Sequence, residues 1–301
     1  MKKTSEPVVF FGSGPVAAES LRLLAGDFAI EAVITKPRPA HHRGSVPVLE
    51  LAEKLGFAIF TATDKSSLDE LFAGAHFASR IGILVDFGII VSQKVIDYFP
   101  LGIVNSHFSL LPEWRGADPI TFSILSGQAQ TGVSLMLLVQ KMDEGPLLGQ
   151  STLPISAQTT APGLTAELVK LSHQLLAENV PKYMEGDIKP ATQDSSHPPT
   201  YSRKLTKEDG KIDWQKPAAQ IEREIRAFAA WPKSYTNYQG LDIIVTAAHV
   251  VNETGTPGTT ALHDKTIVFY TSKQALAIDK LKPAGKGEMT SAAFIAGHRN
   301  Q

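Results

Sequence analysis

The chain has 301 residues, of which 43% are hydrophobic and 20% are charged, and its formal net charge is −1. This is the composition of a globular protein with room for one large domain or two modest ones, and it excludes the disordered and fibrous classes. The sequence contains no cysteine, which excludes disulfides, thiolate metal sites and a cysteine nucleophile.

The N-terminal apolar patch is interrupted by Pro7, Gly12, Gly14 and Pro15, well short of a signal-peptide core or a membrane span. We therefore expect a cytoplasmic protein that does not associate with membranes. The charge is unevenly distributed, because residues 1–202 hold 15 Lys and Arg against 20 Asp and Glu, whereas residues 203–301 hold 14 against 10. A basic C-terminal third is compatible with a polyanionic partner, but a difference of this size also arises by chance.

The first 155 residues alternate short β-branched and aromatic runs with amphipathic stretches. The predicted strands cover residues 7–12, 28–35, 57–62, 80–88, 102–107, 131–139 and 145–155. The predicted helices cover residues 15–26, 47–56, 65–74, 92–99, a segment from about residue 118, and the long stretch 161–187. This order predicts an α/β fold with a Rossmann-like, mostly parallel sheet that helices cover on both faces.

Beyond residue 187 the pattern changes. Residues 188–204 are polar, rich in Pro, Ser and Thr, and without helical or strand periodicity, which predicts a linker. After a predicted helix over 217–231, short strands alternate with Gly, Pro and Asn turns at residues 235–239, 242–251, 265–271 and 274–284. This pattern is typical of a small antiparallel β-barrel.

The glycines after the first predicted strand give a weak dinucleotide-binding signal. Gly12 and Gly14, followed by Ala17, match G-x-G-x-x-A. The second strand, however, ends at Lys36 without the acidic residue that would bind a ribose. Pro15 suits the first turn of a helix, so a tight strand-to-helix turn explains the glycines, and an anion at the helix N-terminus is the alternative.

Polar side chains at the end of the strand over 102–107 form the main candidate site. Asn105 and His107 are two residues apart, so both point to the same side of an extended strand, at the edge where open α/β sheets bind ligands. Together with Asp143, which follows the strand over 131–139, they would supply an amide donor, an imidazole and a proton acceptor, as acyl transfer to an amine requires. Loop capping and ordinary turn chemistry are the structural alternatives for the same residues.

Other catalytic classes lack their motifs. The nine histidines are scattered without metal-ligand spacing, so we expect no metal. There is no G-x-S-x-G elbow and no P-loop, which argues against a serine hydrolase and an ATPase.

The motif Asn105-x-His107-x-Ser109-x-Leu111-Pro112-x-x-Arg115-Gly116, with the later Asp143 and with Asp86-Phe87-Gly88, resembles the formyltransferase family that uses 10-formyltetrahydrofolate. The resemblance implies that Asn105, His107 and Asp143 are catalytic, with Asn105 and His107 stabilising an oxyanion while Asp143 orients His107 and accepts a proton. It also implies 10-formyltetrahydrofolate as the cosubstrate. The implied folate-binding residues are Asp86, Phe87, Gly88, Ile89, Ile90, Ser109, Leu110, Leu111 and Pro112.

The C-terminal half resembles the family members that formylate methionyl-initiator tRNA in bacterial translation initiation, on the segment 201–214, on Ile225–Phe228 and on Trp231-Pro232. This implies a catalytic domain over 1–187, a linker over 188–204, and an OB-like tRNA-binding domain over 205–301, with no obligate protein partner. The implied tRNA contacts are Lys36, Arg38, Arg43, Arg115, Lys204 and Lys207.

One feature departs from those members. Their basic loop after the second strand is usually longer than the corresponding loop here, Lys36–Ser45. A sugar-nucleotide N-formyltransferase of the same fold and a catalytically silent folate-binding module are the alternative functions.

Overall fold

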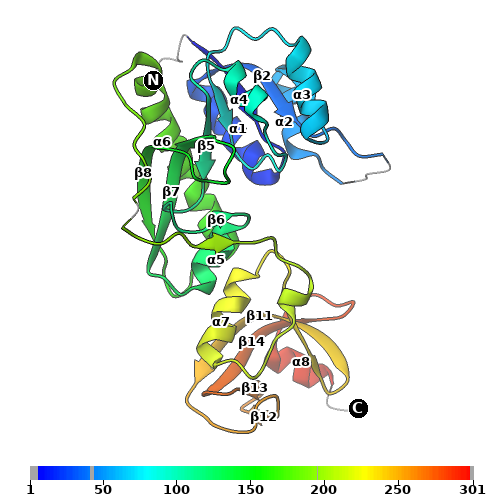
Figure 1. Ribbon diagram of the computed structural model, residues 1–301. Helices are drawn as coiled ribbons and strands as arrows, with labels where there is room; N and C mark the ends of the chain where they lie inside the picture. The colour runs from blue at the N-terminus through cyan, green and yellow to red at the C-terminus, as the bar shows by residue number, and fades with distance from the viewer. Residues whose placement is uncertain (1–5, 41–43, 195, 299–301) are drawn as a thin grey trace. The chain divides into compact units, whose positions relative to one another are not determined.

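The computed structural model describes residues 6–40, 44–194 and 196–298 (Figure 1). Contacts divide the chain into two compact units. Unit 1 comprises residues 1–116, 130–154 and 165–201, and unit 2 comprises residues 117–129, 155–164 and 202–301. Residues 117–129 and 155–164 therefore group with the C-terminal part, while the predicted domain boundaries at 187 and 204 stay predictions.

Unit 1 is built on a seven-stranded sheet, counted over the described residues, with the order β3-β2-β1-β4-β5-β7-β8. The pairs from β3 to β5 are parallel, whereas β5–β7 and β7–β8 are antiparallel, which confirms the mostly parallel sheet. The strands are β1 (Pro7–Phe11), β2 (Ala29–Thr35), β3 (Ala58–Thr61), β4 (Gly82–Leu84), β5 (Ile103–His107), β7 (Gln130–Leu137) and β8 (Leu147–Pro154). The helices are α1 (Pro15–Asp27), α2 (Pro47–Leu55), α3 (Lys65–Gly74), α4 (Gln93–Tyr98) and α6 (Ala161–Glu185), whose residues from 165 onward belong to this unit.

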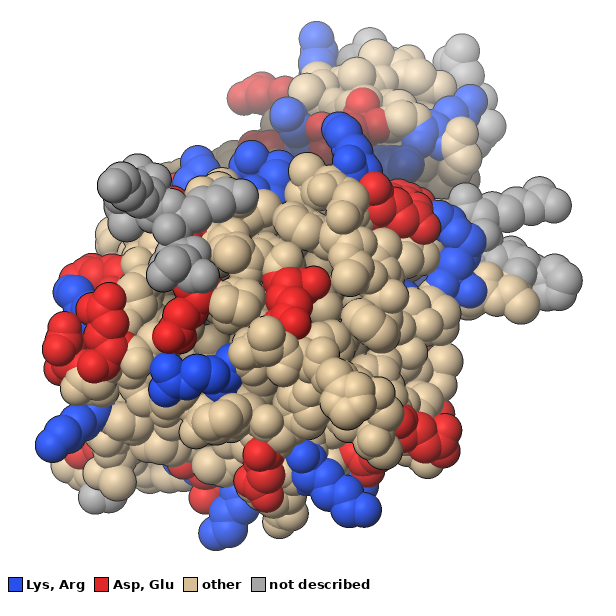
Figure 2. All heavy atoms as spheres, turned by 90° about the horizontal axis from the view of Figure 1, so that it is seen from above, with Lys and Arg blue, Asp and Glu red and all other residues tan. Residues whose placement is uncertain are grey.

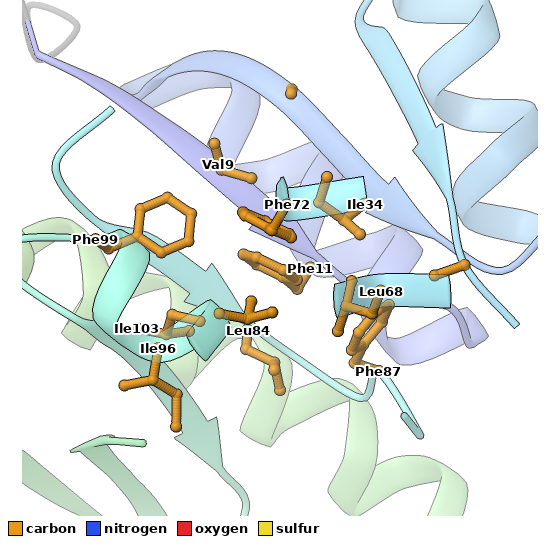
Figure 3. Close-up of a cluster of buried hydrophobic side chains, with 13 residues drawn as sticks. Val9, Phe11, Ile34, Leu68, Phe72, Leu84, Phe87, Ile96, Phe99 and Ile103 are labelled. Carbon is orange, nitrogen blue, oxygen red and sulfur yellow. The ribbon is translucent and has the colours of Figure 1, made fainter. Parts of the chain in front are cut away.

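The central strand β1 is buried on both faces. Residues 8–11 are fully buried, which is typical of a parallel strand between two helical layers. On one face, Phe11 packs against the rings of Phe72 from α3, Phe87 from the β4–α4 loop and Phe99 after α4 (Figure 3). Each fully buried ring contributes about 1.5–3 kcal/mol, so this cluster fixes α3, α4 and the β4–α4 loop against the sheet.

Local sequence signals set the helix ends in this unit. Pro15 lies in the first turn of α1, as predicted. The Asp64 side chain accepts the Ser67 N–H at 2.9 Å, and the Ser67 hydroxyl accepts the Asp64 N–H at 3.1 Å, which starts α3 with a capping box. Helix α2 stops at Gly56, whose φ of 73° is the left-handed conformation of a C-cap.

Unit 2 contains a six-stranded antiparallel sheet, again counted over the described residues, with the order β10-β11-β14-β13-β12 and with β15 paired to β14. Its strands are β10 (Ser234–Tyr238), β11 (Leu241–Val251), β12 (Thr260–His263), β13 (Thr266–Tyr270), β14 (Ala275–Pro283) and β15 (Met289–Thr290). Its helical elements are α5 (Pro119–Leu125), η1 (Glu208–Gly210), α7 (Ala218–Ala227) and α8 (Ser291–Gly297). The Trp214 ring stacks on Phe269 with centroids 4.2 Å apart, inside a core that α7 and α8 share with the sheet. The predicted antiparallel C-terminal sheet is confirmed.

The segment over residues 188–201, the connecting segment from here on, has little regular structure but is hydrogen-bonded along unit 1. Ala191 and Leu147 exchange two backbone hydrogen bonds of 2.6 and 2.9 Å. Further along, the Thr200 N–H bonds to the Pro112 carbonyl at 3.3 Å. Short strands β6 (Arg115–Gly116) and β9 (Tyr201–Ser202) pair with each other. The backbone of this segment is therefore hydrogen-bonded to the unit at several points.

Within the described residues, no helix has the length and the apolar run that crossing a membrane requires.

Candidate active site

The carboxyl ends of β4 and β5 lie side by side at the edge of the unit 1 sheet. The two strands are parallel, with Leu84 opposite Asn105. The strand order also changes direction between β1 and β4, and ligands of open α/β sheets bind outside the strand ends at such a point. Asn105 and His107 both lie at this edge, and they are 8% and 7% exposed.

The imidazole of His107 is held from one side by the loop that follows it. Its Nε2 lies 2.9 Å from the Trp114 carbonyl oxygen. Because a carbonyl can only accept, Nε2 carries the proton of this hydrogen bond. The other ring nitrogen, Nδ1, is 3.9 Å from Asp143 Oδ1, which is longer than a hydrogen bond and short enough for an ion pair with a protonated ring. The structure thus brings Asp143 to His107, and Nδ1 is the nitrogen that faces the carboxylate.

Asp143 lies in the turn between β7 and β8, and its carboxylate is anchored. Oδ2 accepts the Gly116 N–H at 2.7 Å, and the side chain is 13% exposed. The residue has a φ of 53°, in the left-handed region that non-glycine residues rarely adopt. Two residues on, a Cβ on Gly145 would lie 1.7 Å from the Leu137 carbonyl oxygen, so only glycine fits there. The tight turn aims the carboxylate at the imidazole.

Asn105 lies between two neighbours of the sheet, opposite Leu84 of β4 and Met136 of β7. As expected for positions two apart in a strand, it shares a side of the sheet with His107. Among the described residues, none hydrogen-bonds to the side-chain amide of Asn105. A buried strand end with a carboxamide and an imidazole on one side can supply two donors to an oxygen that becomes negative.

The loop over residues 109–112 is fastened to β7 and β8. The Ser134 hydroxyl accepts the Leu111 N–H at 2.9 Å and donates to the Ser109 carbonyl at 2.6 Å. The Gln150 amide donates to the Leu111 carbonyl at 2.9 Å. Ser109 itself is fully buried and donates to the Glu113 carbonyl at 2.5 Å. Of the predicted folate-binding residues in this loop, Ser109, Leu111 and Pro112 are buried and Leu110 is half-buried.

The segment over residues 86–90, between β4 and α4, is the other predicted folate-binding stretch. Phe87 is 1% exposed and part of the core, whereas Ile90 is 73% exposed and Ile89 half-buried. Asp86 and Gly88 both have positive φ values, of 45° and 65°. In this segment the buried Phe87 ring anchors the chain to the core, while Asp86, Gly88 and Ile90 are exposed.

The glycine-containing loop after β1 packs closely against the segment over residues 86–90. A Cβ on Gly14 would lie 2.1 Å from Asp86 Oδ2. Ser13 donates its N–H to the Asp86 carbonyl at 3.1 Å and its hydroxyl to the Phe87 carbonyl at 2.6 Å. A close approach between two loops at the strand edge therefore explains Gly14 without a dinucleotide.

A cavity of about 520 Å³ opens beside Ile90. Its lining combines residues of α3, of the β4–α4 loop, of the start of α4 and of the β7–β8 loop, namely Lys65, Asp69, Ile90, Val91, Ser92, Gln93, Lys94 and Gln140. The volume is in the range of small-molecule sites, and the lining mixes apolar side chains with cationic and amide groups.

Two of the predicted tRNA-contacting residues after β2, Lys36 and Arg38, bond to other residues of unit 1. Lys36 donates to the Gly88 carbonyl at 3.0 Å. Arg38 pairs with Glu50 at 2.9 Å. Hydrogen bonds from Ser45 and then from Arg38 lower the pKa of Glu50 to about 2. Arg43 lies outside the described residues.

The other predicted tRNA contacts differ in exposure. The Arg115 side chain is 11% exposed and bonds to Glu144 at 3.2 Å and to Gln193 at 2.7 Å. Lys204 and Lys207, in unit 2, are exposed. On the face seen in Figure 2, basic and acidic side chains are interspersed rather than gathered by sign. The tRNA contacts of all six residues stay predictions.

In the described part of the chain, no group of three or more His, Asp or Glu side chains is arranged to hold a metal ion.

Sequence reasoning missed two residues that the structure places against the candidate site. The Trp114 carbonyl holds His107, and the Gln193 amide donates to the backbone carbonyl of Asp143 itself. A backbone carbonyl leaves no trace in residue type, and Gln193 lies in a stretch without periodicity. Neither residue had a signal in a single sequence.

Comparison with known families covers both parts of the chain. The family described as Formyl transferase matches residues 23–180, and the family described as Formyl transferase, C-terminal domain, matches residues 204–299. Neither match extends into residues 181–203, which include the connecting segment.

Similar proteins match over nearly their whole length. A protein of Enterococcus faecalis named methionyl-tRNA formyltransferase is 33% identical, covering 96% of this chain and 95% of that protein. One of the same name from a Roseiflexus species is 36% identical, covering 97% of this chain and 92% of that protein.

Solved structures share the fold at low identity. An N-formyltransferase of Helicobacter canadensis, in complex with folinic acid and dTDP-3-aminofucose, has a TM-score of 0.67 at 19% identity and covers 92% of this chain and 98% of its own. HypX of Aquifex aeolicus, in complex with tetrahydrofolic acid, has a TM-score of 0.63 at 18% identity and covers 97% of this chain and 47% of its own. On the sequence matches to both parts, the chain belongs to the formyl transferase family.

Proposed function

We propose that this protein transfers the formyl group of 10-formyltetrahydrofolate to the α-amine of methionyl-initiator tRNA. Relatives that match nearly the whole chain carry the name methionyl-tRNA formyltransferase, which supports this acceptor. The observation that carries the chemistry is the buried pair of His107 and Asp143, 3.9 Å apart, at the same sheet edge as Asn105.

Each of the three residues has a role that follows from its geometry. The amine nitrogen attacks the formyl carbon, and the carbonyl oxygen becomes negative in a tetrahedral intermediate. The Asn105 amide and the protonated Nδ1 of His107 donate to that oxygen, because Nε2 is already bonded to the Trp114 carbonyl. Asp143 accepts the proton that leaves the amine. The intermediate then collapses, the bond from the formyl carbon to N10 of the folate breaks, and N10 takes up the proton that Asp143 accepted, which returns Asp143 to the carboxylate.

The electrostatics of the pair favour this sequence. Asp143 and His107 are mostly shielded from water, so the carboxylate stabilises a cationic imidazole more strongly than it would at an exposed surface. The imidazolium in turn stabilises the oxyanion. Removal of one such donor typically lowers turnover about 100- to 1,000-fold.

The folate is proposed to lie along residues 86–90, next to the cavity beside Ile90. Asp86 and Gly88 are exposed residues whose backbone groups can hydrogen-bond to the edge of a pterin, and the exposed Ile90 side chain can cover an aromatic ring. Phe87 contributes by anchoring the segment to the core rather than by contact with the ligand. The acceptor tRNA is proposed to be held by its phosphates, which the basic C-terminal third can neutralise.

Formylation with labelled cosubstrate tests this proposal. The purified protein is incubated with [¹⁴C-formyl]-10-formyltetrahydrofolate and is offered methionyl-initiator tRNA, elongator methionyl-tRNA, or a dTDP-linked amino sugar. We expect label on the initiator tRNA. Label on the amino sugar alone would instead establish the sugar-nucleotide alternative, and label on no acceptor would leave a folate-binding module.

A further inference from the structure

Gln193 connects two loops of the site through one side chain. Its Nε2 donates to the Asp143 carbonyl at 2.7 Å and to the Gly145 carbonyl at 2.9 Å. Its Oε1 accepts from Arg115 at 2.7 Å. The side-chain amide of Gln193 therefore uses both its hydrogens and its oxygen. Its hydrogens bond to the turn that contains Asp143, and its oxygen bonds to Arg115, the residue after Trp114.

The turn that Gln193 holds has a strained backbone. Asp143 is not glycine and yet has a φ of 53°. Such a conformation persists only where its surroundings enforce it. Gln193 binds the carbonyl of Asp143 itself and that of Gly145, so it restrains the peptide units that orient the Asp143 side chain.

The connecting segment also bonds to the loop that holds His107. The Trp114 N–H donates to the Thr200 hydroxyl at 2.9 Å, and the Arg115 N–H donates to the Thr200 carbonyl at 2.9 Å. The Trp114 carbonyl is the partner of His107. One segment is thus bonded next to both members of the His107–Asp143 pair.

We propose that Gln193 is a positioning residue for formyl transfer, which fixes the Asp143 turn and with it the distance from Asp143 to His107. This inference rests on the proposed function. Gln193 acts through backbone carbonyls, so its removal shifts the carboxylate without changing its chemistry.

Kinetics of Gln193→Ala and Gln193→Glu test the inference. The glutamate variant keeps the shape and the acceptor for Arg115, but it lacks the N–H donors and places an oxygen against two carbonyl oxygens. We expect both variants to lower kcat by roughly 10- to 100-fold, as small displacements of catalytic groups do, with the KM for folate and for tRNA unchanged.

Asp194→Ala is the matched control. Asp194 is the next residue of the segment, is exposed, and bonds locally to Ser196. This variant should retain the wild-type kcat and the wild-type KM for both substrates. Thermal melting of every variant separates a loss of folded protein from a loss of turnover per folded molecule.

The outcomes divide clearly. If wild-type protein formylates the tRNA and Gln193→Glu matches it in kcat, the positioning role is wrong while the proposed function stands. The role is equally wrong if activity falls only in proportion to the folded fraction. If the wild-type protein formylates no tRNA, the proposed function fails and this inference fails with it.

Discussion

The substitution Asp143→Asn removes the negative charge of the candidate site and, with it, the proposed proton acceptor. The amide has the shape of the carboxylate, and its oxygen can still accept the Gly116 N–H that Oδ2 accepts at 2.7 Å. What is lost is a negative charge 3.9 Å from His107 Nδ1, between side chains that are 7% and 13% exposed. At that separation, with an effective dielectric constant of roughly 20, two unit charges interact by about 4 kcal/mol. This corresponds to about a 1,000-fold lower rate if the full interaction is made in the transition state.

The assay is single-turnover transfer of labelled formyl groups to methionyl-initiator tRNA at saturating folate. We expect Asp143→Asn to have a rate about 1,000-fold below that of the wild type, with an unchanged melting temperature. A variant that keeps more than roughly a tenth of the wild-type rate would refute the electrostatic reasoning, since one factor of ten is only about 1.4 kcal/mol.

Three further substitutions have expected outcomes. Asn105→Ala should lower kcat about 100- to 1,000-fold by removing an oxyanion donor, and steady-state kinetics with an unchanged circular dichroism spectrum would check this. Gly145→Ala should lower the free energy of unfolding, measured by urea titration, by about 1–3 kcal/mol, because the added Cβ would lie 1.7 Å from a backbone oxygen. The control Gly26→Ala meets no neighbouring atom within 4 Å of its Cβ, so it should be neutral or stabilising. Glu50→Gln should be less stable than the wild type at pH 7. Because the folded-state pKa of Glu50 is lowered to about 2 from an ordinary value of 4.5, that difference should vanish as the pH falls from 4.5 to 2, and a constant difference across this range would contradict the assignment.

Much of the architecture follows from local patterns. The run of Val8–Phe11 is apolar at every position, as a strand covered on both faces requires, and it is the central strand of the sheet. Asn105 and His107 could be placed on one side of a strand end because the side-chain period of a strand is two. These predictions needed only neighbours in sequence.

The candidate site depends on contacts that no local pattern encodes. Asp143 reaches His107 because a tight turn with Gly145 against Leu137 directs it there, and the sequence alone shows only an acidic residue near a glycine. Gln193 lies in a stretch whose composition predicts a linker, yet its amide bonds to the Asp143 turn across 50 positions of sequence. Long-range hydrogen bonds of single side chains leave no periodicity to detect.

Arg115 illustrates the same limit from the other direction. Arg115 is a predicted tRNA contact, and its side chain is 11% exposed and bonded to Glu144 and Gln193. The tRNA contact itself stays a prediction. Residue type predicts the charge, whereas the partner that the charge meets depends on tertiary packing.

The most direct test of the account is a double-mutant cycle on the His107–Asp143 pair. Single-turnover formylation rates are measured for wild-type protein, His107→Ala, Asp143→Asn and the double variant. Residues that act as one unit give non-additive losses, so we predict that the double variant is no slower than the slower single variant. Losses that multiply, or single variants that keep wild-type rates, would contradict a catalytic role for the pair.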